Sequence, residues 1–223
     1  MINNWSVHPF QRCSIGFFHQ LQGNVIYKPY GANAWANNDA STGKFSLSCP
    51  AQIYTEDLKN HATLQASPGI FQEKIGKDFE VRVTVMGKSC CAVKILSQEH
   101  NSTKNDWRQD YSNLKIERMV LPEKISNLCL DYMQRADLRF GCFDFIVTPD
   151  GEYFFLEINQ MGQFLWQEDM QPDIPLLQMF CDFLISGNTG FTWQETVPTV
   201  TFSAYKASKA GRTFKESLRK QVA

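Results

Sequence analysis

The sequence lacks the patterns that mark several large classes of protein. Its seven cysteines and four histidines form no Cys-x-x-Cys pair and no zinc-ligand spacing, so neither a disulfide framework nor a zinc site is expected. It has no apolar run long enough to cross a bilayer and no N-terminal stretch that resembles a signal peptide. We therefore expect free thiols in the reducing cytoplasm and no membrane partner.

An excess of charge is also lacking, apart from one segment. The 22 Lys and Arg residues nearly balance the 23 Asp and Glu residues, and a net charge of -1 predicts no general attraction to nucleic acid. The exception follows Tyr205, where six basic residues stand against the single acid Glu216. We interpret residues 196–223 as a basic C-terminal tail, for which a solvated helix is favoured over a docking arm.

No internal repeat or low-complexity segment is present, and a hydrophobic fraction of 43% fits a folded protein. The clearest strand is Asp78–Met86, in which Val81, Val83 and Val85 alternate with polar residues, predicting one buried face and one charged face. Further strands are expected at Asn24–Tyr30, Phe45–Leu47, Gln52–Tyr54, Ile70–Glu73 and Cys90–Leu96, with a hairpin of Phe143–Val147 and Tyr153–Ile158. Helices are expected from Glu123 and over Pro175–Ile185, and loops over Gly31–Gly43 and Ser97–Asn113. This pattern predicts an α+β fold of two lobes with antiparallel hairpins.

The strongest candidate for a chemical site is the trio Asp144, Glu157 and Asn159. Carboxylate and amide oxygens are hard ligands that suit magnesium beside phosphates, and these acids interrupt apolar runs in which an unpaired carboxylate is costly to bury. The alternative is that acids near strand ends simply face water.

Glu157 and Asn159 share a strand face, but the position of Asp144 depends on the turn. A two-residue loop at Pro149-Asp150 pairs Asp144 with Phe155 and keeps it on the same face. A three-residue loop with a glycine bulge turns it away.

Four other charged residues are weaker candidates on their own. Glu80 and Arg82 lie two apart on the polar face of one strand and suggest an exposed ion pair. Lys28 ends an apolar strand, and Arg108 follows Trp107 in a polar loop; both are typical of surface residues beside a partly buried neighbour.

In chain order, however, these residues resemble those of the ATP-grasp ligases. Asn-Val-Ile-Tyr-Lys28-Pro resembles the small-lobe strand whose lysine holds a nucleotide phosphate, and Phe-Glu80-Val-Arg resembles the strand whose acid binds the ribose. The hinge that meets the adenine edge in that family matches Gln72, Glu73, Lys74 and Ile75. The family's magnesium ligands match Asp144, Glu157 and Asn159.

Within the superfamily the sequence is most similar to the graspetide (microviridin-type) peptide maturases. The similarity rests on Phe-Glu-Val-Arg82-Val-Thr-Val-Met-Gly, Asp106-Trp107-Arg108, Tyr-Phe-Phe-Leu-Glu157-Ile-Asn159 and Gly162-Gln163-Phe-Leu-Trp166, and it extends over residues 20–195. It implies a small lobe over residues 1–72 and a large lobe over 73–195, which clamp ATP and Mg²⁺.

The resemblance also implies a reaction. A carboxylate on a peptide or protein becomes an acyl phosphate and is then captured by an amine or a hydroxyl to form an amide or an ester. Arg82 and Arg108 are expected to stabilise the transferred phosphoryl group and the acyl phosphate.

The sequence departs from the family in two ways. A pre-ATP-grasp domain is expected to be absent, because the chain begins almost at the lysine strand, and a second nucleotide lysine has no candidate. The Gly31–Gly43 loop is rich in Asn and Ala rather than Gly. A separate leader-binding partner and a homodimer are both compatible with this pattern. The alternatives are a non-catalytic ATP-grasp remnant that binds nucleotide or peptide, and a glutamate-adding ligase that acts on a protein terminus.

Overall fold

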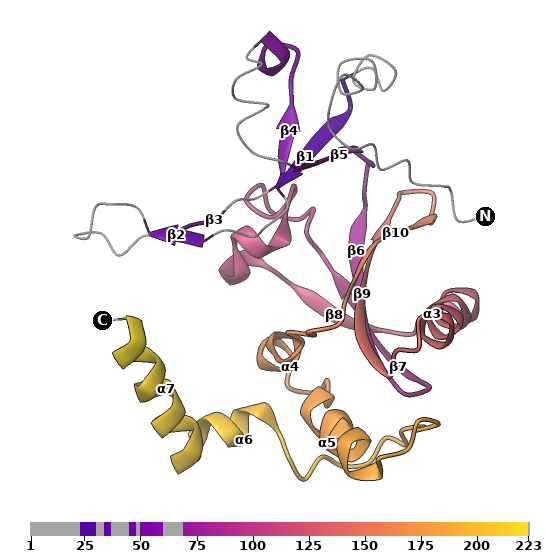
Figure 1. The fold of residues 1–223 in the computed structure, drawn as a ribbon, viewed down its shortest axis with the longest axis vertical. Helices are drawn as coiled ribbons and strands as arrows, with labels where there is room; N and C mark the ends of the chain where they lie inside the picture. Colours follow the sequence, from indigo (N-terminus) through magenta and orange to yellow (C-terminus); the bar gives the residue numbers. More distant parts are fainter. Residues whose placement is uncertain (1–22, 30–33, 37–44, 48–49, 60–68, 223) are drawn as a thin grey trace. The chain divides into compact units, whose positions relative to one another are not determined.

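The structure is a computed structural model that describes residues 23–29, 34–36, 45–47, 50–59 and 69–222 (Figure 1). The chain divides into two compact units. The first consists of Met1–Asp78, Ser97–Leu114 and Thr148–Asp150, and the second of Phe79–Leu96, Lys115–Val147 and Gly151–Ala223. Along the described part of the chain, no helix is both long and apolar enough to span a bilayer.

The first unit is built on an antiparallel sheet with strand order β4-β1-β5. Its strands are β1 (Val25–Pro29), β4 (Ala51–Ile53) and β5 (Gly69–Glu73), close to the predicted positions. Gly69 is required here, since a Cβ at this position would lie 2.2 Å from the ring of Tyr27. The unit also contains three short 3-10 turns, η1 (Asp57–Lys59), η2 (Trp107–Gln109) and η3 (Tyr111–Asn113).

The loop predicted over Gly31–Gly43 is wrong at three residues. Ala34–Ala36 forms strand β2 and pairs antiparallel with β3 (Phe45–Leu47), which was expected. Alternating small and aromatic residues in a segment this short carry too little periodicity to be recognised as a strand. The remaining residues of that loop lie outside the described part.

The second unit contains a five-stranded antiparallel sheet with strand order β10-β9-β6-β7-β8. The strands are β6 (Phe79–Met86), β7 (Ser89–Ile95), β8 (Ile116–Met119), β9 (Phe140–Val147) and β10 (Tyr153–Asn159). Strand β8 was not predicted, because its sequence, Ile-Glu-Arg-Met, does not alternate residue by residue between apolar and charged side chains. It forms the edge of the sheet beside β7.

Helix α3 (Glu123–Arg135) begins where Pro122 and Glu123 predicted, and it covers one face of this sheet. Ile125, Cys129 and Met133 from α3 pack in one buried cluster with the valines of β6 and with Phe143 and Phe145 of β9. Burial of these side chains from both elements forms the main core of the unit.

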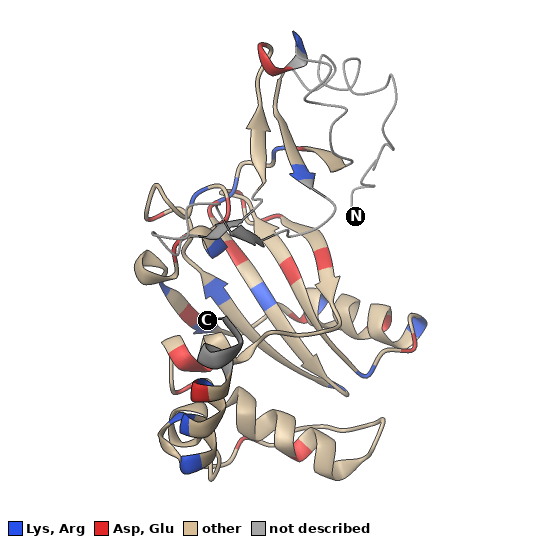
Figure 2. Cartoon of the chain, turned by 60° about the vertical axis from the view of Figure 1, so that its left-hand side comes forward, with Lys and Arg blue, Asp and Glu red and all other residues tan. Residues whose placement is uncertain are grey.

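The other face of β6 does not carry exposed charge, contrary to the prediction. Glu80, Arg82 and Thr84 are 7%, 5% and 0% exposed. Alternation identified the two faces correctly, but it cannot show whether the polar face is covered by segments more distant in the sequence. Charged residues mark the central strands of the sheet in Figure 2.

The hairpin of β9 and β10 has the second of the two predicted turn geometries, a three-residue loop in which Gly151 is left-handed with a φ of +81°, and it carries a further bulge in β10. Tyr153 pairs with Val147 and Phe155 with Phe145, but Glu157 then pairs with Asp144, so Leu156 is an extra residue in β10. A bulge of this kind shifts the register by one residue. The turn alone would set Asp144 opposite Leu156 and on the other face from Glu157, as predicted for that loop, and the extra residue inside β10 instead places Asp144 directly opposite Glu157.

After β10 the chain is mainly helical, with α4 (Leu165–Met170), α5 (Leu176–Ser186), α6 (Phe202–Ala207) and α7 (Lys209–Val222). Helix α5 ends at Gly187 as predicted, whereas the short α4 was not predicted. The buried carboxylate of Glu168 in α4 accepts the backbone N–H of Leu177 at 2.7 Å and of Phe202 at 2.6 Å. One side chain thus caps the first turns of both α5 and α6.

Burial of the thiols predicts low reactivity. The pKa of the Cys90 and Cys91 thiols is raised to about 11, and that of Cys129 to about 12, with desolvation as the main cause. A raised pKa keeps these groups protonated at pH 8, and the thiolate is the reactive form. We expect a thiol reagent such as iodoacetamide to label them at least tenfold more slowly at pH 8 in the native protein than in 8 M urea. Mass spectrometry of the labelled peptides gives both rates, and equal rates would contradict the burial.

Candidate active site

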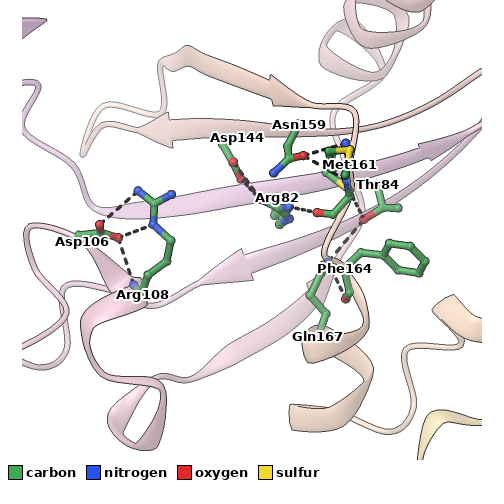
Figure 3. A network of polar contacts seen from close by, with 11 residues as sticks. Arg82, Thr84, Asp106, Arg108, Asp144, Asn159, Met161, Phe164 and Gln167 are labelled. Carbon is green, nitrogen blue, oxygen red and sulfur yellow. Dashed lines mark hydrogen bonds and ion pairs between the residues drawn. The ribbon is translucent and has the colours of Figure 1, made fainter. Parts of the chain in front are cut away.

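The covered face of the five-stranded sheet carries a row of polar side chains (Figure 3). Arg82 and Thr84 project from it on β6, and Asp144 projects beside them from β9, where it pairs directly with Arg82. Arg82 is buried and the Asp144 side chain is 14% exposed. The row lies at the centre of the sheet, where strands on both sides hold the backbone in place.

Arg82 is held by two groups from different segments. Its Nη1 donates to both oxygens of Asp144 at 2.9 Å, and its Nη2 donates to the Gly162 carbonyl at 2.5 Å. The exposed Glu80–Arg82 pair suggested by the sequence is therefore not the arrangement that forms around Arg82, whose charge partner is Asp144. A buried guanidinium needs such partners because desolvation without them is costly.

Glu157 and Asn159 lie on the same face of the sheet as Asp144, through the bulge in β10. Glu157 is exposed, and Asn159 is half-buried. The Oδ1 atom of Asn159 accepts the backbone N–H of Met161 at 2.9 Å and of Gly162 at 3.1 Å. In this structure the Asn159 oxygen therefore shapes the loop that presents the Gly162 carbonyl to Arg82.

The side-chain oxygens of Asp144, Glu157 and Asn159 suit a magnesium ion that is bound together with a nucleotide. Two opposed carboxylates share one sheet face, and such ions commonly take one or two carboxylates together with phosphate oxygens and water. Within the described residues, no group of three or more His, Cys, Asp or Glu side chains is placed to hold a metal alone. A magnesium ion here would thus depend on a ligand that supplies the remaining oxygens.

Gly162 is fixed by its surroundings. Its φ is +80°, and a Cβ at this position would lie 2.7 Å from the Phe140 ring. That ring packs with Phe164 and Phe180, each at a centroid distance of 5.5 Å. The aromatic trio anchors the loop at the start of α4, and a left-handed backbone in such confinement favours glycine.

In the first unit, Arg108 forms a separate charged pair. Asp106 is buried and accepts from the Nε of Arg108 at 2.9 Å and from its Nη2 at 3.2 Å, while it also caps η2 through the Arg108 backbone N–H. The Arg108 side chain is 51% exposed. Trp107 between them is buried, and not half-buried as the sequence suggested. The Asp106 contact leaves Arg108 oriented and still accessible to a ligand.

The remaining predicted residues divide between the units. Lys28 pairs with Ile70 across β1 and β5, and Gln72 and Glu73 complete β5. The Lys74 ammonium donates to Gln52 at 2.7 Å, so this lysine is tied to β4, and Ile75 follows it. Glu80 belongs to the second unit, where it is buried on the same sheet face as Arg82.

The sequence did not indicate three participants in the polar row, namely Thr84, Gly162 and Gln167. The Gln167 amide donates to the Phe164 carbonyl at 3.1 Å and lies 3.5 Å from the Thr84 hydroxyl. The only available signal was a glutamine in the otherwise apolar string Phe-Leu-Trp-Gln. Its side chain is fully buried.

Solved structures are similar to this chain in fold. A RiPP-associated ATP-grasp ligase from Chryseobacterium gregarium, in complex with ADP and a leader and core peptide, is 26% identical with a TM-score of 0.73, over 82% of this chain and 55% of that one. The macrocyclase MdnC from Microcystis aeruginosa MRC, bound with precursor peptide MdnA, is 28% identical with a TM-score of 0.69, over 82% and 57%. The chain has the ATP-grasp fold.

A third ATP-grasp structure supports the fold alone. The ligase PsnB, complexed with a phosphomimetic variant of a minimal precursor, Mg and ADP, is 24% identical with a TM-score of 0.61, over 81% of this chain and 52% of that one. This ATP-grasp chain spans a little over half the length of these solved structures. No protein-family model and no curated protein matches the sequence.

Proposed function

We propose that this ATP-grasp chain contributes the metal-binding and phosphoryl-transfer site of a ligase that modifies peptides. The observation that carries the proposal is the directly opposed pair Asp144 and Glu157 beside the buried Arg82. Similar structures are ligases solved with ADP, with Mg and with leader, core or precursor peptides. The proposed substrates are therefore ATP and a carboxylate on a peptide or protein.

In the proposed reaction, a carboxylate oxygen of the peptide attacks the γ-phosphorus of ATP. The bond to the bridging oxygen breaks, ADP leaves with the electron pair, and an acyl phosphate remains. An amine or hydroxyl then attacks the acyl carbon, and inorganic phosphate leaves as the amide or ester forms.

Each charged residue has a role in this scheme. Asp144 and Glu157, with Asn159, would hold Mg²⁺, which neutralises phosphate charge and orients the γ-phosphoryl group. Arg82 would stabilise the transferred phosphoryl group from a buried position, where a fixed cation acts more strongly than in water. Arg108, oriented by Asp106, would contact the acyl phosphate.

The nucleotide residues and the wider organisation also remain proposals. Lys28 would bind a phosphate, Gln72–Ile75 would meet the adenine, and Glu80 would bind the ribose. Residues 1–72 and 73–195 would form the small and large lobes, followed by the basic tail. A separate leader-binding partner and a homodimer belong to the same proposal. The five described cysteines are free thiols, which supports a cytoplasmic location.

Nucleotide binding tests the metal assignment directly. The chain should bind ADP at least tenfold more weakly in EDTA than in excess Mg²⁺, because two carboxylates that face a polyanion repel bare phosphates. Isothermal titration calorimetry measures both constants on the same preparation. Equal affinity under the two conditions would remove Asp144 and Glu157 as ligands of a nucleotide-bound metal.

A further inference from the structure

Two fully buried polar atoms in the second unit make no hydrogen bond to any described residue. They are the Nε of Arg82, which is a donor, and the Oε1 of Gln167, which is an acceptor. Arg82 is 5% exposed and Gln167 is 0% exposed. Buried polar groups in native proteins are nearly always paired, so each of these atoms calls for a partner. One atom offers what the other needs.

Thr84 places Gln167 beside the strand that carries Arg82. This residue lies two positions from Arg82 on the same face of β6, and its hydroxyl is 3.5 Å from the Nε2 of Gln167 (Figure 3). The Thr84 hydroxyl is also 3.6 Å from the Sγ of Cys142. Gln167 therefore sits beside the polar row and is not merely packed in the core of α4.

The orientation of the Gln167 amide is determined by its contacts. Its Nε2 donates to the Phe164 carbonyl at 3.1 Å. If the amide were turned over, Oε1 would face that carbonyl, and neither oxygen could donate. Oε1 is consequently the amide atom of Gln167 that remains without a partner among the described residues. Nη1 and Nη2 of Arg82 donate to Asp144 and Gly162, and Nε is the guanidinium nitrogen that has no partner among the described residues.

We propose that Gln167 is a positioning residue for Arg82, joined to it by one buried water that accepts from Nε–H and donates to Oε1. A polar site between groups that cannot reach each other directly is where proteins keep such waters, and Thr84 offers a further partner. With this link all three nitrogens of the guanidinium are held, by β9, by the loop after β10 and by α4. Rotation of the side chain about its Cδ–Nε bond is then opposed from three directions.

The proposal rests on the proposed function only where it says what the positioned Arg82 does. The link itself is a structural property that can be observed whether or not the chain ligates anything. This separates its failure from the failure of the proposed function.

Nuclear magnetic resonance of the arginine Nε–H groups tests the link on the full chain. The Arg82 signal is the one that disappears in Arg82→Lys, and it should exchange with water at least tenfold more slowly at pH 8 than the exposed Arg135 signal. In Gln167→Leu, which keeps the volume but removes the acceptor, the Arg82 signal should move upfield and lose at least tenfold of its protection.

Gln134→Leu, the same change on the exposed face of α3, is the matched control and should leave the Arg82 signal unmoved. An unchanged Arg82 signal in folded Gln167→Leu would overturn the proposal. If Gln167→Leu does not fold, the wild type still decides the matter, since an Arg82 Nε–H that exchanges as fast as that of Arg135 also overturns the proposal. With an active ligase, Gln167→Leu should lower kcat about tenfold with little change in the KM for ATP.

Discussion

Replacing Glu157 by glutamine is expected to lower peptide-dependent ADP release by about 10²-fold or more. Glutamine keeps the size of the side chain but removes one of the two charges that face each other across β9 and β10. A magnesium ion with one anionic ligand fewer loses both affinity and its position at the γ-phosphoryl group. The fold should be unaffected, because Glu157 is exposed and its nearest cross-strand neighbour, Asp144, repels it.

A coupled assay of ADP release measures this effect with synthetic peptides that carry Glu and Asp beside Lys, Ser and Thr. Glu117→Gln is the matched control, since it makes the same change at an exposed position of β8 that pairs with Lys94, away from the polar row. Full activity in Glu157→Gln would exclude this residue as a metal ligand. A wild-type chain that binds Mg-ATP but never turns over, even with an added leader-binding domain, would favour the non-catalytic alternative.

Asp144→Asn should destabilise the protein by about 3 kcal/mol, although it is the same kind of change on the opposite strand. Asp144 is the charge partner of Arg82, which is 6% exposed in its side chain. Asparagine still offers an acceptor oxygen but removes the charge of the carboxylate whose two oxygens both accept from the buried guanidinium. Glu157→Gln, in contrast, should change the free energy of unfolding by no more than about 0.5 kcal/mol.

Urea denaturation of the wild type and the two variants measures the difference, with the slope of the transition as a check that the same surface unfolds. The pair forms its own control, because each variant removes one carboxylate from directly opposed positions. Similar stabilities of the two variants would mean that Arg82 does not depend on Asp144. The burial of Arg82 would then have to be supported by the Gly162 carbonyl and α4.

Much of the fold follows from local patterns in the sequence. The valines of β6 recur at a period of two, and Pro122 and Glu123 mark the start of α3; both signals are local and strong. Strands β2 and β8 escaped prediction because three or four residues cannot establish a period. Their strand geometry is imposed by the neighbours with which they pair.

The candidate site was less accessible from sequence. The residue types of Asp144, Glu157 and Asn159 indicated oxygen ligands, but their common face depends on the extra residue in β10, which no local signal marked. The burial of Arg82 was missed for a related reason. Its cover comes from the loop at Gly162 and from α4, about 80 residues later in the chain, and polar alternation in β6 carries no information about them.

Leu156 is an extra residue in β10 that lies outside the cross-strand pairing of the hairpin. The pairs before it, such as Phe155 with Phe145, and the pairs after it, such as Glu157 with Asp144, differ in register by one residue. Leu156 therefore has no partner of its own among the described pairs. Loss of this one residue would straighten β10 and still leave the following acid opposite Asp144. The hairpin of β9 and β10 can therefore lose a residue at this point without exchanging its two faces.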